Sequence, residues 1–315
     1  MLGYDTINFH VDASYLSTDT IKQLALLLPR EGVNNATGAR WQAGNVDNLI
    51  VSLNELGMNV SGSLASFYYG NNTLTLSKRE VKNALQKLSD TLHFDMAQAE
   101  VKRVDISTSF QMRNKVQAYL NILGSLTYFA RVNTTKNTLT YTRGEQSKQA
   151  LCFYDKEREQ KDKHQSKDFP QPYKDTGNVL RYEARLLKQI PQQLGEAVVT
   201  GGMLGNTDIF RKVAKFWGES YFCIQKSYTD IDMKKVKTPK DAQDLLLAHL
   251  LNEAGAGTLD NYLNLLKAKG VFRNRQYYTN FKTSIKKIMG KYSDKGSESL
   301  ARELDNCVRT ELSYL

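Results

Sequence analysis

The sequence predicts an α+β protein: an internally duplicated antiparallel sheet domain with helices on one face, followed by a helical C-terminal region. Three observations lead to this prediction. Apolar and polar residues alternate in many short segments of residues 1–227, which is typical of strands that bury one face. The order of strand, helix and paired strands occurs twice there, as a repeat of layout. In residues 228–315 the apolar spacing is helical.

The first half of the sheet domain, residues 1–95, starts with clean alternation over Asp5–Val11, a predicted strand. Further along, Ser77 and Glu80 have the spacing of a capping box, which marks the start of a helix. The pattern after the first strand predicts in turn a helix, a loop, two strands and a helix: Thr18–Leu28, Pro29–Gly44, Val46–Leu53, Val60–Tyr69 and Ser77–Leu92.

The second half, residues 96–227, repeats this layout. Alternation in its last strand sends the apolar residues to the core and leaves Arg181, Glu183 and Arg185 in a row on the other face. The predicted elements are a strand, a helix, two strands, a polar helix to about Lys163, a loop and a strand: Val101–Phe110, Lys115–Leu123, Thr138–Thr142, Gln149–Tyr154, the polar helix, Ser166–Gly177 and Val179–Leu187.

The chain carries a net charge of +10, and most of the excess lies in residues 233–291. That segment has twelve basic and four acidic residues, an excess of +8. Such an excess favours a polyanionic partner, nucleic acid before membrane. We therefore predict a basic helical DNA-binding region over residues 228–315. Its helices are Pro239–Leu251, Leu259–Lys269, Asn280–Met289 and Ser297–Leu312.

Bases and aromatic residues mix around the start of the third of these helices. The DNA contacts expected in this region are Arg273, Arg275, Lys286 and Lys287. The alternative is a solvated basic face over a helical core that contains the aromatic rings.

Other features restrict the class of protein. No run of about 18 apolar residues is present, and the first residues lack the regions of a signal peptide, so we expect no membrane partner. Cys152, Cys223 and Cys307 show no paired spacing, which fits a reduced cytosolic protein. The histidines are far apart, so a metal would rest mainly on carboxylates, which favours Mg²⁺ or Mn²⁺.

One stretch, Leu151–Gln160, indicates a buried strand that runs directly into a charged helix. Tyr154 is its last ring before the charged residues. A phenol beside a cation suits a nucleophile that attacks phosphate, because Lys156 would stabilise the phenolate, which is scarce at an ordinary pKa of about 10. The alternative is that Tyr154 is a structural aromatic residue at a strand end.

One surface would carry three polar rows if their strands are neighbours: Arg103, Asp105 and Ser107; Cys152 and Tyr154; and Arg181, Glu183 and Arg185. Asp105 and Glu183 would then ligate one divalent ion that polarises a phosphate oxygen. Glu159 either joins this metal site or only pairs with a lysine. The alternative for each row is a ladder of surface ion pairs across strands. The arginines expected to hold a DNA backbone from these rows are Arg103, Arg181 and Arg185.

Four blocks of the sequence stand in the same order as in a known family. They are Arg103–Ser107, Thr138–Tyr141, Leu151–Gln160 and Leu180–Leu186. With these blocks the chain resembles the rolling-circle replication initiators of the filamentous-phage gene II/X type, and it is similar to the replication initiators of small staphylococcal plasmids. The order of the four blocks is fairly specific, whereas any one block alone is weak.

The resemblance implies an enzyme that nicks one DNA strand at an origin through a covalent 5′-phosphotyrosyl intermediate and later rejoins the ends. It implies that Tyr154 is the nucleophile and that Asp105 and Glu183 are metal-site positions. Related nucleases usually carry a His-hydrophobic-His metal motif, which this sequence lacks. Carboxylates would have to replace that motif.

The implied partners are origin DNA, both duplex and single-stranded, and a host polymerase in the cytoplasm of a bacterial host. A host helicase is also expected, because the sequence has no Gly-rich nucleotide loop followed by Lys-Ser/Thr. A homodimer is left open. The competing hypothesis is a non-catalytic protein that binds an origin or operator, in which Tyr154 is structural.

Overall fold

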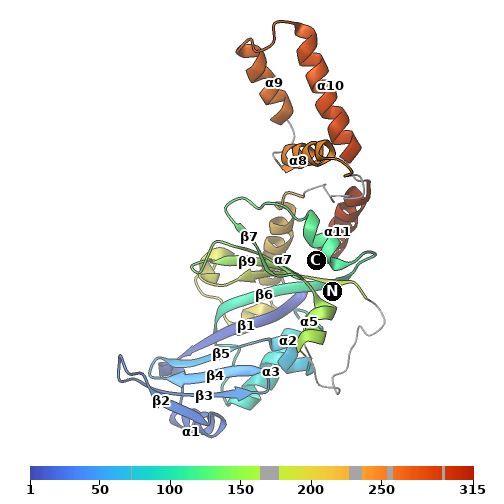
Figure 1. Ribbon diagram of the computed structural model, residues 1–315. Coiled ribbons are helices and arrows are strands. Elements are labelled where there is room, and N and C mark those ends of the chain that lie inside the picture. Colours follow the sequence, from blue (N-terminus) through green and yellow to red (C-terminus); the bar gives the residue numbers. More distant parts are fainter. Residues whose placement is uncertain (72, 164–176, 227–235, 254–257, 293–294) are drawn as a thin grey trace.

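The computed structural model of the protein describes residues 1–71, 73–163, 177–226, 236–253, 258–292 and 295–315. The strands form one sheet in the order β2-β3-β4-β5-β1-β6-β10-β9-β8-β7, and neighbouring strands are antiparallel (Figure 1). The predicted α+β class with a helical C-terminal region is confirmed. In spatial order the strands are Arg30–Val33, Arg40–Val46, Leu49–Asn54, Gly57–Ser61, Gly3–Asp12, Glu100–Gln111, Val179–Leu186, Gln149–Asp155, Thr138–Thr142 and Ala130–Thr135.

The sheet is built from two halves with the same topology. In each half a long strand, β1 or β6, is followed by a helix and then by four strands. Consecutive strands of these four are neighbours in the sheet, and the fourth, β5 or β10, pairs with the long strand. The two helices are α1 (Thr18–Leu27) and α4 (Val116–Ile122). β1 and β6 also pair with each other and join the halves. The duplicated layout therefore puts β1 and β6 at the centre of the sheet.

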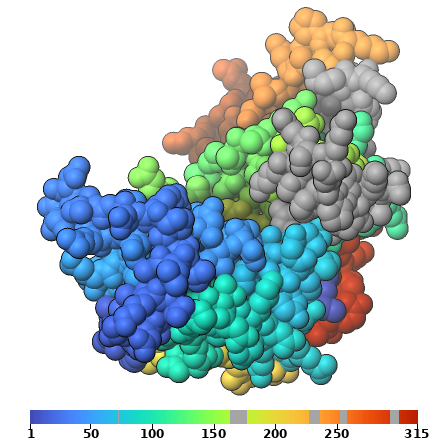
Figure 2. Space-filling view, turned by 90° about the horizontal axis from the view of Figure 1, so that it is seen from below, coloured from blue at the N-terminus to red at the C-terminus, as the bar shows by residue number. Residues whose placement is uncertain are grey.

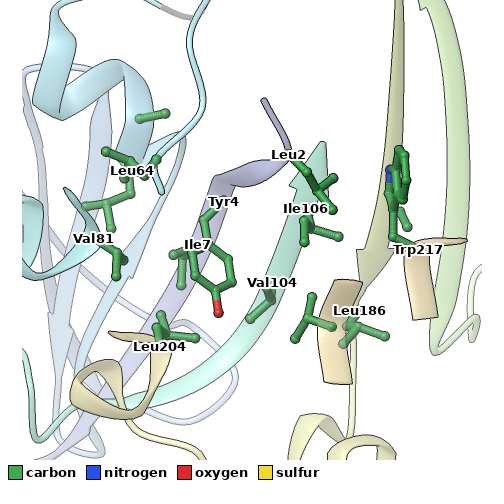
Figure 3. Close-up of a cluster of buried hydrophobic side chains, with 14 of the residues drawn as sticks. Leu2, Tyr4, Ile7, Leu64, Val81, Val104, Ile106, Leu186, Leu204 and Trp217 are labelled. Atoms are coloured by element: carbon green, nitrogen blue, oxygen red, sulfur yellow. The ribbon is translucent and has the colours of Figure 1, made fainter. Parts of the chain in front are cut away.

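Helices cover the apolar face of the sheet, where the core lies. α3 (Glu80–Leu92) and α7 (Thr207–Phe222) bury Val81 and Trp217 in the same core as strand residues such as Ile106 (Figure 3). Tyr182 of β10 stacks on Phe153 of β9 with ring centroids 4.3 Å apart. These buried rings fix the register of the two strands, since a slip of one residue would move them to the opposite face.

One helix borders the other, polar face. α5 (Lys156–Lys163) follows β9 without a loop, as the sequence predicts. Asp155 caps it by accepting a hydrogen bond from the backbone N–H of Arg158 at 3.0 Å. Lys156 is buried and lines a pocket together with polar strand residues. The strand-to-helix junction therefore carries Lys156 to the rim of the polar face.

A β-bulge interrupts the pairing of β1 with β6. The register shifts between Tyr4 and Ile7. As a result Asp5 and Thr6 stand opposite the single residue Asp105. A bulge of this kind bends the strand and re-aims the side chain of the extra residue. Here both residues of the bulge, Asp5 and Thr6, line the pocket on the polar face.

Two predictions for the first half are wrong. The predicted loop Pro29–Gly44 contains β2 and most of β3, an edge hairpin of largely exposed residues that lacks the alternation of a half-buried strand. The predicted strand Val60–Tyr69 ends at Ser61, and α2 (Leu64–Tyr69) follows. The hydroxyl group of Ser63 accepts a backbone hydrogen bond at 3.0 Å and caps this helix, which is why the chain leaves the sheet there.

Other local predictions are confirmed. The backbone N–H of Ser77 donates to the Glu80 carboxylate at 3.0 Å, and the N–H of Glu80 donates to the Ser77 hydroxyl at 3.3 Å, the reciprocal bonds of a capping box. The loop expected over Ser166–Gly177 lies almost wholly outside the described residues.

Sequence analysis missed β7, α6 (Ile190–Leu194), α7 and the 3-10 turns Ala13–Tyr15 and Gly201–Gly205.

The C-terminal helices divide between two places. α8 (Pro239–Glu253), α9 (Thr258–Ala268) and α10 (Arg275–Tyr292) lie together, and α8 and α10 share a small apolar cluster of their own (Figure 1). We name α8–α10 the helical insertion. The space-filling view shows it in orange at one end of the molecule (Figure 2). None of the helices in the described ranges has the length and hydropathy needed to span a bilayer.

The last helix, α11 (Lys295–Ser313), packs on the sheet domain. Its Leu304 is part of the main core. Its Glu303 accepts a hydrogen bond from the hydroxyl of Tyr119 on α4 at 2.6 Å. This corrects the predicted boundary, because residues 228–315 are not one unit. The sheet domain consists of the described residues up to 226 together with α11, and the basic helical insertion lies between them in sequence.

Candidate active site

A pocket of about 310 Å³ opens on the polar face of the sheet, over β1, β6, β9 and β10. It brings together residues of both halves of the domain that lie far apart in sequence. Seven of the eight site residues predicted from the sheet domain line it. They are Arg103, Asp105, Tyr154, Lys156, Glu159, Glu183 and Arg185.

Tyr154 stands at the centre of this group. Its hydroxyl donates a hydrogen bond to Oε1 of Glu183 at 2.7 Å. Burial, and then the negative charge of Glu183, raise the pKa of Tyr154 well above its ordinary value. In the free protein the phenol is therefore protonated, and its proton already points at a carboxylate oxygen.

Glu183 is surrounded by cations. Its Oε1 also accepts from Nε of Arg181 at 3.2 Å, and its Oε2 accepts from Arg185 at 2.7 and 3.1 Å. Burial alone would raise the pKa of Glu183. The positive charges of Arg185 and Arg181, together with the bond from Tyr154, outweigh burial and lower it to about 2. Glu183 is therefore an ionised acceptor at neutral pH.

Arg181 lies beneath the pocket. The sequence placed it among the residues that contact DNA, but its side chain is fully buried. Its guanidinium group donates to Asp5 at 2.6 Å, to the hydroxyl of Ser107 at 2.8 Å and to Glu183. A side chain without exposed surface in this arrangement does not reach a DNA backbone. Its position instead links β1, β6 and β10 under the pocket.

Asp105 forms the second carboxylate centre of the pocket. Both of its oxygens accept hydrogen bonds from Arg103, at 2.6 and 2.8 Å. Nε of Arg185 lies 3.7 Å from the same carboxylate. Burial raises the pKa of Asp105 to about 6, although Arg103 opposes this rise. Arg103 and Arg185 are each partly exposed, so both can also meet a ligand in the pocket.

Lys156 and Glu159 form a pair at the start of α5. Nζ of Lys156 donates to Oε2 of Glu159 at 2.9 Å, and it lies 5.7 Å from the centroid of the Tyr154 ring. Burial and the positive charge of Arg181 lower the pKa of Lys156. The sequence left the role of Glu159 open, and the structure shows the lysine pair.

Sequence analysis missed Asp5 and Ser63. Asp5 accepts from Arg181 and from the hydroxyl of Ser63, the latter at 2.6 Å. The signal for Asp5 is at the start of the first strand, where an acidic residue takes a place in the alternating series Ile7, Phe9 and Val11 that faces the core. Ser63 falls in the segment predicted as a strand, so its capping role and its contact with Asp5 were hidden together.

The carboxylates have the chemistry that Mg²⁺ or Mn²⁺ prefers, but their arrangement does not fit a metal ion. Within the described residues no three metal-ligating side chains of His, Cys, Asp or Glu are grouped. Four carboxylates and four cations pair in and under the pocket, so the formal charge is zero. The pairs are Asp5 with Arg181, Asp105 with Arg103, Glu159 with Lys156, and Glu183 with Arg181 and Arg185.

The DNA contacts expected in the helical insertion lie elsewhere. Arg273 lies between α9 and α10, and Arg275, Lys286 and Lys287 are on α10. All four side chains are exposed, and none lines the pocket that holds Tyr154. The structure therefore presents two separate clusters of basic residues.

Residues 51–214, just over half of the chain, match the model of a family described as the N-terminal part of a phage replication-associated protein. The chain belongs to this family. The resemblance to phage and plasmid rolling-circle replication initiators is thus confirmed, and with it a role in the initiation of replication. Initiators of this kind are generally nicking endonucleases that bind origin DNA and typically use a divalent metal. The matched range contains every pocket residue discussed above except Asp5 and Thr6.

Among solved structures, the chain is similar to a rolling-circle replication initiator protein from Geobacillus stearothermophilus. The identity is 12% and the TM-score is 0.36, over 69% of this chain and 84% of that chain. No curated protein matches the sequence.

Proposed function

We propose that this family member nicks one DNA strand at a replication origin through a covalent tyrosyl intermediate, with Tyr154 as the nucleophile. The observation that carries the proposal is the hydrogen bond from the Tyr154 hydroxyl to Glu183, inside a pocket that also holds two partly exposed arginines. A nucleophile bonded to an acceptor that is itself held in place is the usual arrangement for covalent catalysis.

The proposed step is a transesterification at one phosphodiester. The phenol oxygen of Tyr154 attacks phosphorus, and its proton passes to Glu183, the acceptor at 2.7 Å. The bond from phosphorus to the 3′ oxygen breaks, and that oxygen leaves with a proton from solvent. The products are a 5′-phosphotyrosyl protein and a free 3′-hydroxyl. Since one ester replaces another, the ends can be rejoined without ATP.

Arg185 has a position from which it can control this proton transfer. It shares its guanidinium group between Glu183 and Asp105. A phosphate bound by Arg185 would weaken the hold of this arginine on Glu183, and the proton affinity of Glu183 would then rise. Arg103 is the second partly exposed cation that can bind the phosphate. Arg181 is proposed to hold Glu183 and Asp5 in place from below.

The divalent ion expected at Asp105, Glu183 and Glu159 is not part of this proposed step, because each of these carboxylates already pairs with a cationic side chain. No step is routed through Mg²⁺ or Mn²⁺. The positive charge that the step requires comes from the two arginines.

The basic helical insertion is proposed to bind the origin duplex, while the sheet domain acts on the strand to be cut. Arg273, Arg275, Lys286 and Lys287 are the contacts proposed from the sequence. A host helicase and a host polymerase would act after the nick, in the cytoplasm of a bacterial host.

The test compares two tyrosines that are both buried. Tyr154→Phe removes the proposed nucleophile. Tyr141→Phe removes a hydroxyl that bonds the backbone of Gly124 on the core face. Each protein is incubated with labelled supercoiled DNA that bears the origin, in buffer with Mg²⁺ or Mn²⁺, and analysed on a denaturing protein gel.

We expect wild type and Tyr141→Phe to nick the DNA and to carry the label, and Tyr154→Phe to bind DNA without doing either. Nicking by Tyr154→Phe would reject the proposed nucleophile. Binding without a nick by the wild type, across metals and origins, would favour the non-catalytic DNA-binding hypothesis.

A further inference from the structure

The helical insertion has a groove between α9 and α10, with a volume of about 430 Å³. Basic and neutral polar residues of both helices line it. The basic residues are Lys267, Arg275, Lys282 and Lys286, and the neutral hydrogen-bonding ones are Asn264, Thr279 and Thr283. Asp260 is the single acidic residue of the lining. Four bases minus one acid give the groove a formal charge of +3.

Helical periodicity explains why these residues share one face. Arg275, Lys282 and Lys286 follow one another on α10 at spacings of seven and four, which bring side chains to the same side of a helix. At a rise of about 1.5 Å per residue, they extend the positive charge over roughly 16 Å. Lys267 adds a base from α9 on the opposite wall.

Most of this charge is available to a ligand. Lys282 pairs with Asp260 across the groove. Lys267, Arg275 and Lys286 are exposed. This is the reverse of the pocket around Tyr154, where each carboxylate is paired with a cation.

We infer that this groove is a binding site for the phosphate backbone of duplex DNA. The inference rests on the proposed origin binding and specifies where it takes place. Exposed lysine and arginine side chains neutralise phosphates, and threonine and asparagine side chains donate to phosphate oxygens. Arg275 and Lys286 are DNA contacts expected from the sequence, whereas Lys267, Lys282 and the polar residues between them are assigned to DNA only by the groove.

The groove favours duplex over single-stranded DNA. Proteins that hold single strands stack the bases on exposed aromatic rings. The one aromatic residue of the lining, Tyr278, is 8% exposed. Its hydroxyl is directed at the backbone, because it donates to the carbonyl of Leu266 at 3.2 Å and accepts from the N–H of Phe272 at 2.9 Å. The lining therefore offers charge and hydrogen bonds, and no ring on which a base would stack.

The test compares two full-length variants that lose the same charge. The groove variant carries Lys267→Gln, Arg275→Gln and Lys286→Gln. The control variant carries Lys237→Gln, Lys240→Gln and Lys269→Gln, three exposed bases of the insertion region that do not line the groove. The affinity for a labelled duplex of arbitrary sequence is measured between ~50 and ~200 mM salt. Vesicles that contain anionic lipid serve as a second polyanion.

We expect the slope of log affinity against log salt to be less steep in the groove variant than in the wild type, by about 2.7. Each of the three lost phosphate contacts contributes roughly 0.9 to the steepness. The control variant should keep a slope close to that of the wild type. Equal losses in both variants, or none in the groove variant, would overturn the inference. A loss that affects only vesicle binding would also overturn it, in favour of a lipid surface.

Formation of the Tyr154 adduct is measured separately, on a single-stranded origin oligonucleotide. The control variant should form the adduct at the wild-type rate. A wild-type protein that forms no adduct would reject the proposed nicking function, and the salt slopes would still decide whether the groove binds duplex.

Discussion

The pocket around Tyr154 and the groove between α9 and α10 are both rich in basic residues, and they use them in opposite ways. In the pocket, Arg181 is fully buried and bonded to Asp5 and Glu183. In the groove, Lys267 and Arg275 are exposed. Buried cations fix the positions of carboxylates, whereas exposed cations leave a net charge for a polyanion. A count of basic residues therefore does not distinguish an active site from a DNA-binding surface; their pairing does.

The largest effect that we expect from this contrast is on stability. Arg181→Met would leave Asp5 and Glu183 buried without their shared cation. Removal of one partner from a buried ionic network destabilises a protein by about 3–5 kcal/mol. We expect a decrease of this size in the free energy of unfolding, measured by urea denaturation with the fluorescence of the buried Trp217 as the signal.

Arg275→Met is the matched control from the groove. Its side chain is exposed, so we expect a stability change within about 0.5 kcal/mol, together with weaker duplex binding. The contrast between the two sites would fail if Arg181→Met had the same urea midpoint of unfolding as the wild type. It would also fail if both variants lost the same free energy of unfolding.

The next effect concerns pH. Burial raises the pKa of Asp105 to about 6, and its charged neighbours in the pocket are Arg103, Arg185 and Glu183. Below this pKa, protonated Asp105 would release Arg103, so the nicking rate should fall. About a tenth of Asp105 stays ionised one unit below its pKa, which predicts a roughly tenfold decrease near pH 5. Duplex binding by the groove should change little over this range, because Asp105 does not line the groove.

Single-turnover nicking rates from about pH 5 to about pH 8 would measure this dependence. In Asp105→Asn the decrease near pH 6 should disappear, at a lower overall rate. The raised pKa of Asp105 has the opposite effect on stability: the nicking rate should rise with pH, whereas the contribution of Asp105 to the free energy of unfolding falls. Between the ordinary value of 3.8 and about 6 the folded protein binds the extra proton, so the contribution of Asp105 to stability falls as the pH rises through this window. A decrease in rate that persists in Asp105→Asn would assign it to another group.

Much of the pocket could be predicted from the sequence because alternation in a strand fixes which residues share a face. Once β6, β9 and β10 are neighbours, Asp105, Tyr154 and Glu183 lie on one side of the sheet. The expectation that these strands are neighbours came from the duplicated layout and the resemblance, since periodicity alone does not say which strands pair.

The sequence does not reveal how deeply each charged side chain is buried or with which group it pairs. Arg181 and Arg185 occupy equivalent places in an alternating pattern, yet one is fully buried and the other partly exposed. The difference arises from Asp5, which the bulge in β1 brings over from the other half of the domain. The place of α11 was hidden for a similar reason. Its apolar stripe indicates a helix that packs on something, but does not identify the sheet domain as its partner.

The smallest effect that we expect concerns Ser63, where the scaffold meets the pocket. Its hydroxyl caps α2 and also donates to Asp5 at 2.6 Å. Ser17 caps α1 in the same manner but lies outside the pocket. Replacement of either serine by alanine should cost about 1 kcal/mol of unfolding free energy, because each removes one helix cap.

Only Ser63→Ala should also slow nicking, by a few-fold, because Asp5 would lose the hydrogen bond from Ser63 that helps to orient its carboxylate toward Arg181. The measurement is the single-turnover nicking rate of both variants at equal residual stability, adjusted by temperature. If Ser17→Ala slowed nicking equally, the effect would be one of stability alone, and the pocket would not depend on the path from Ser63 through Asp5 to Arg181. If only Ser63→Ala is slow, the first half of the sheet supplies a positioning contact to the tyrosine carried by the second.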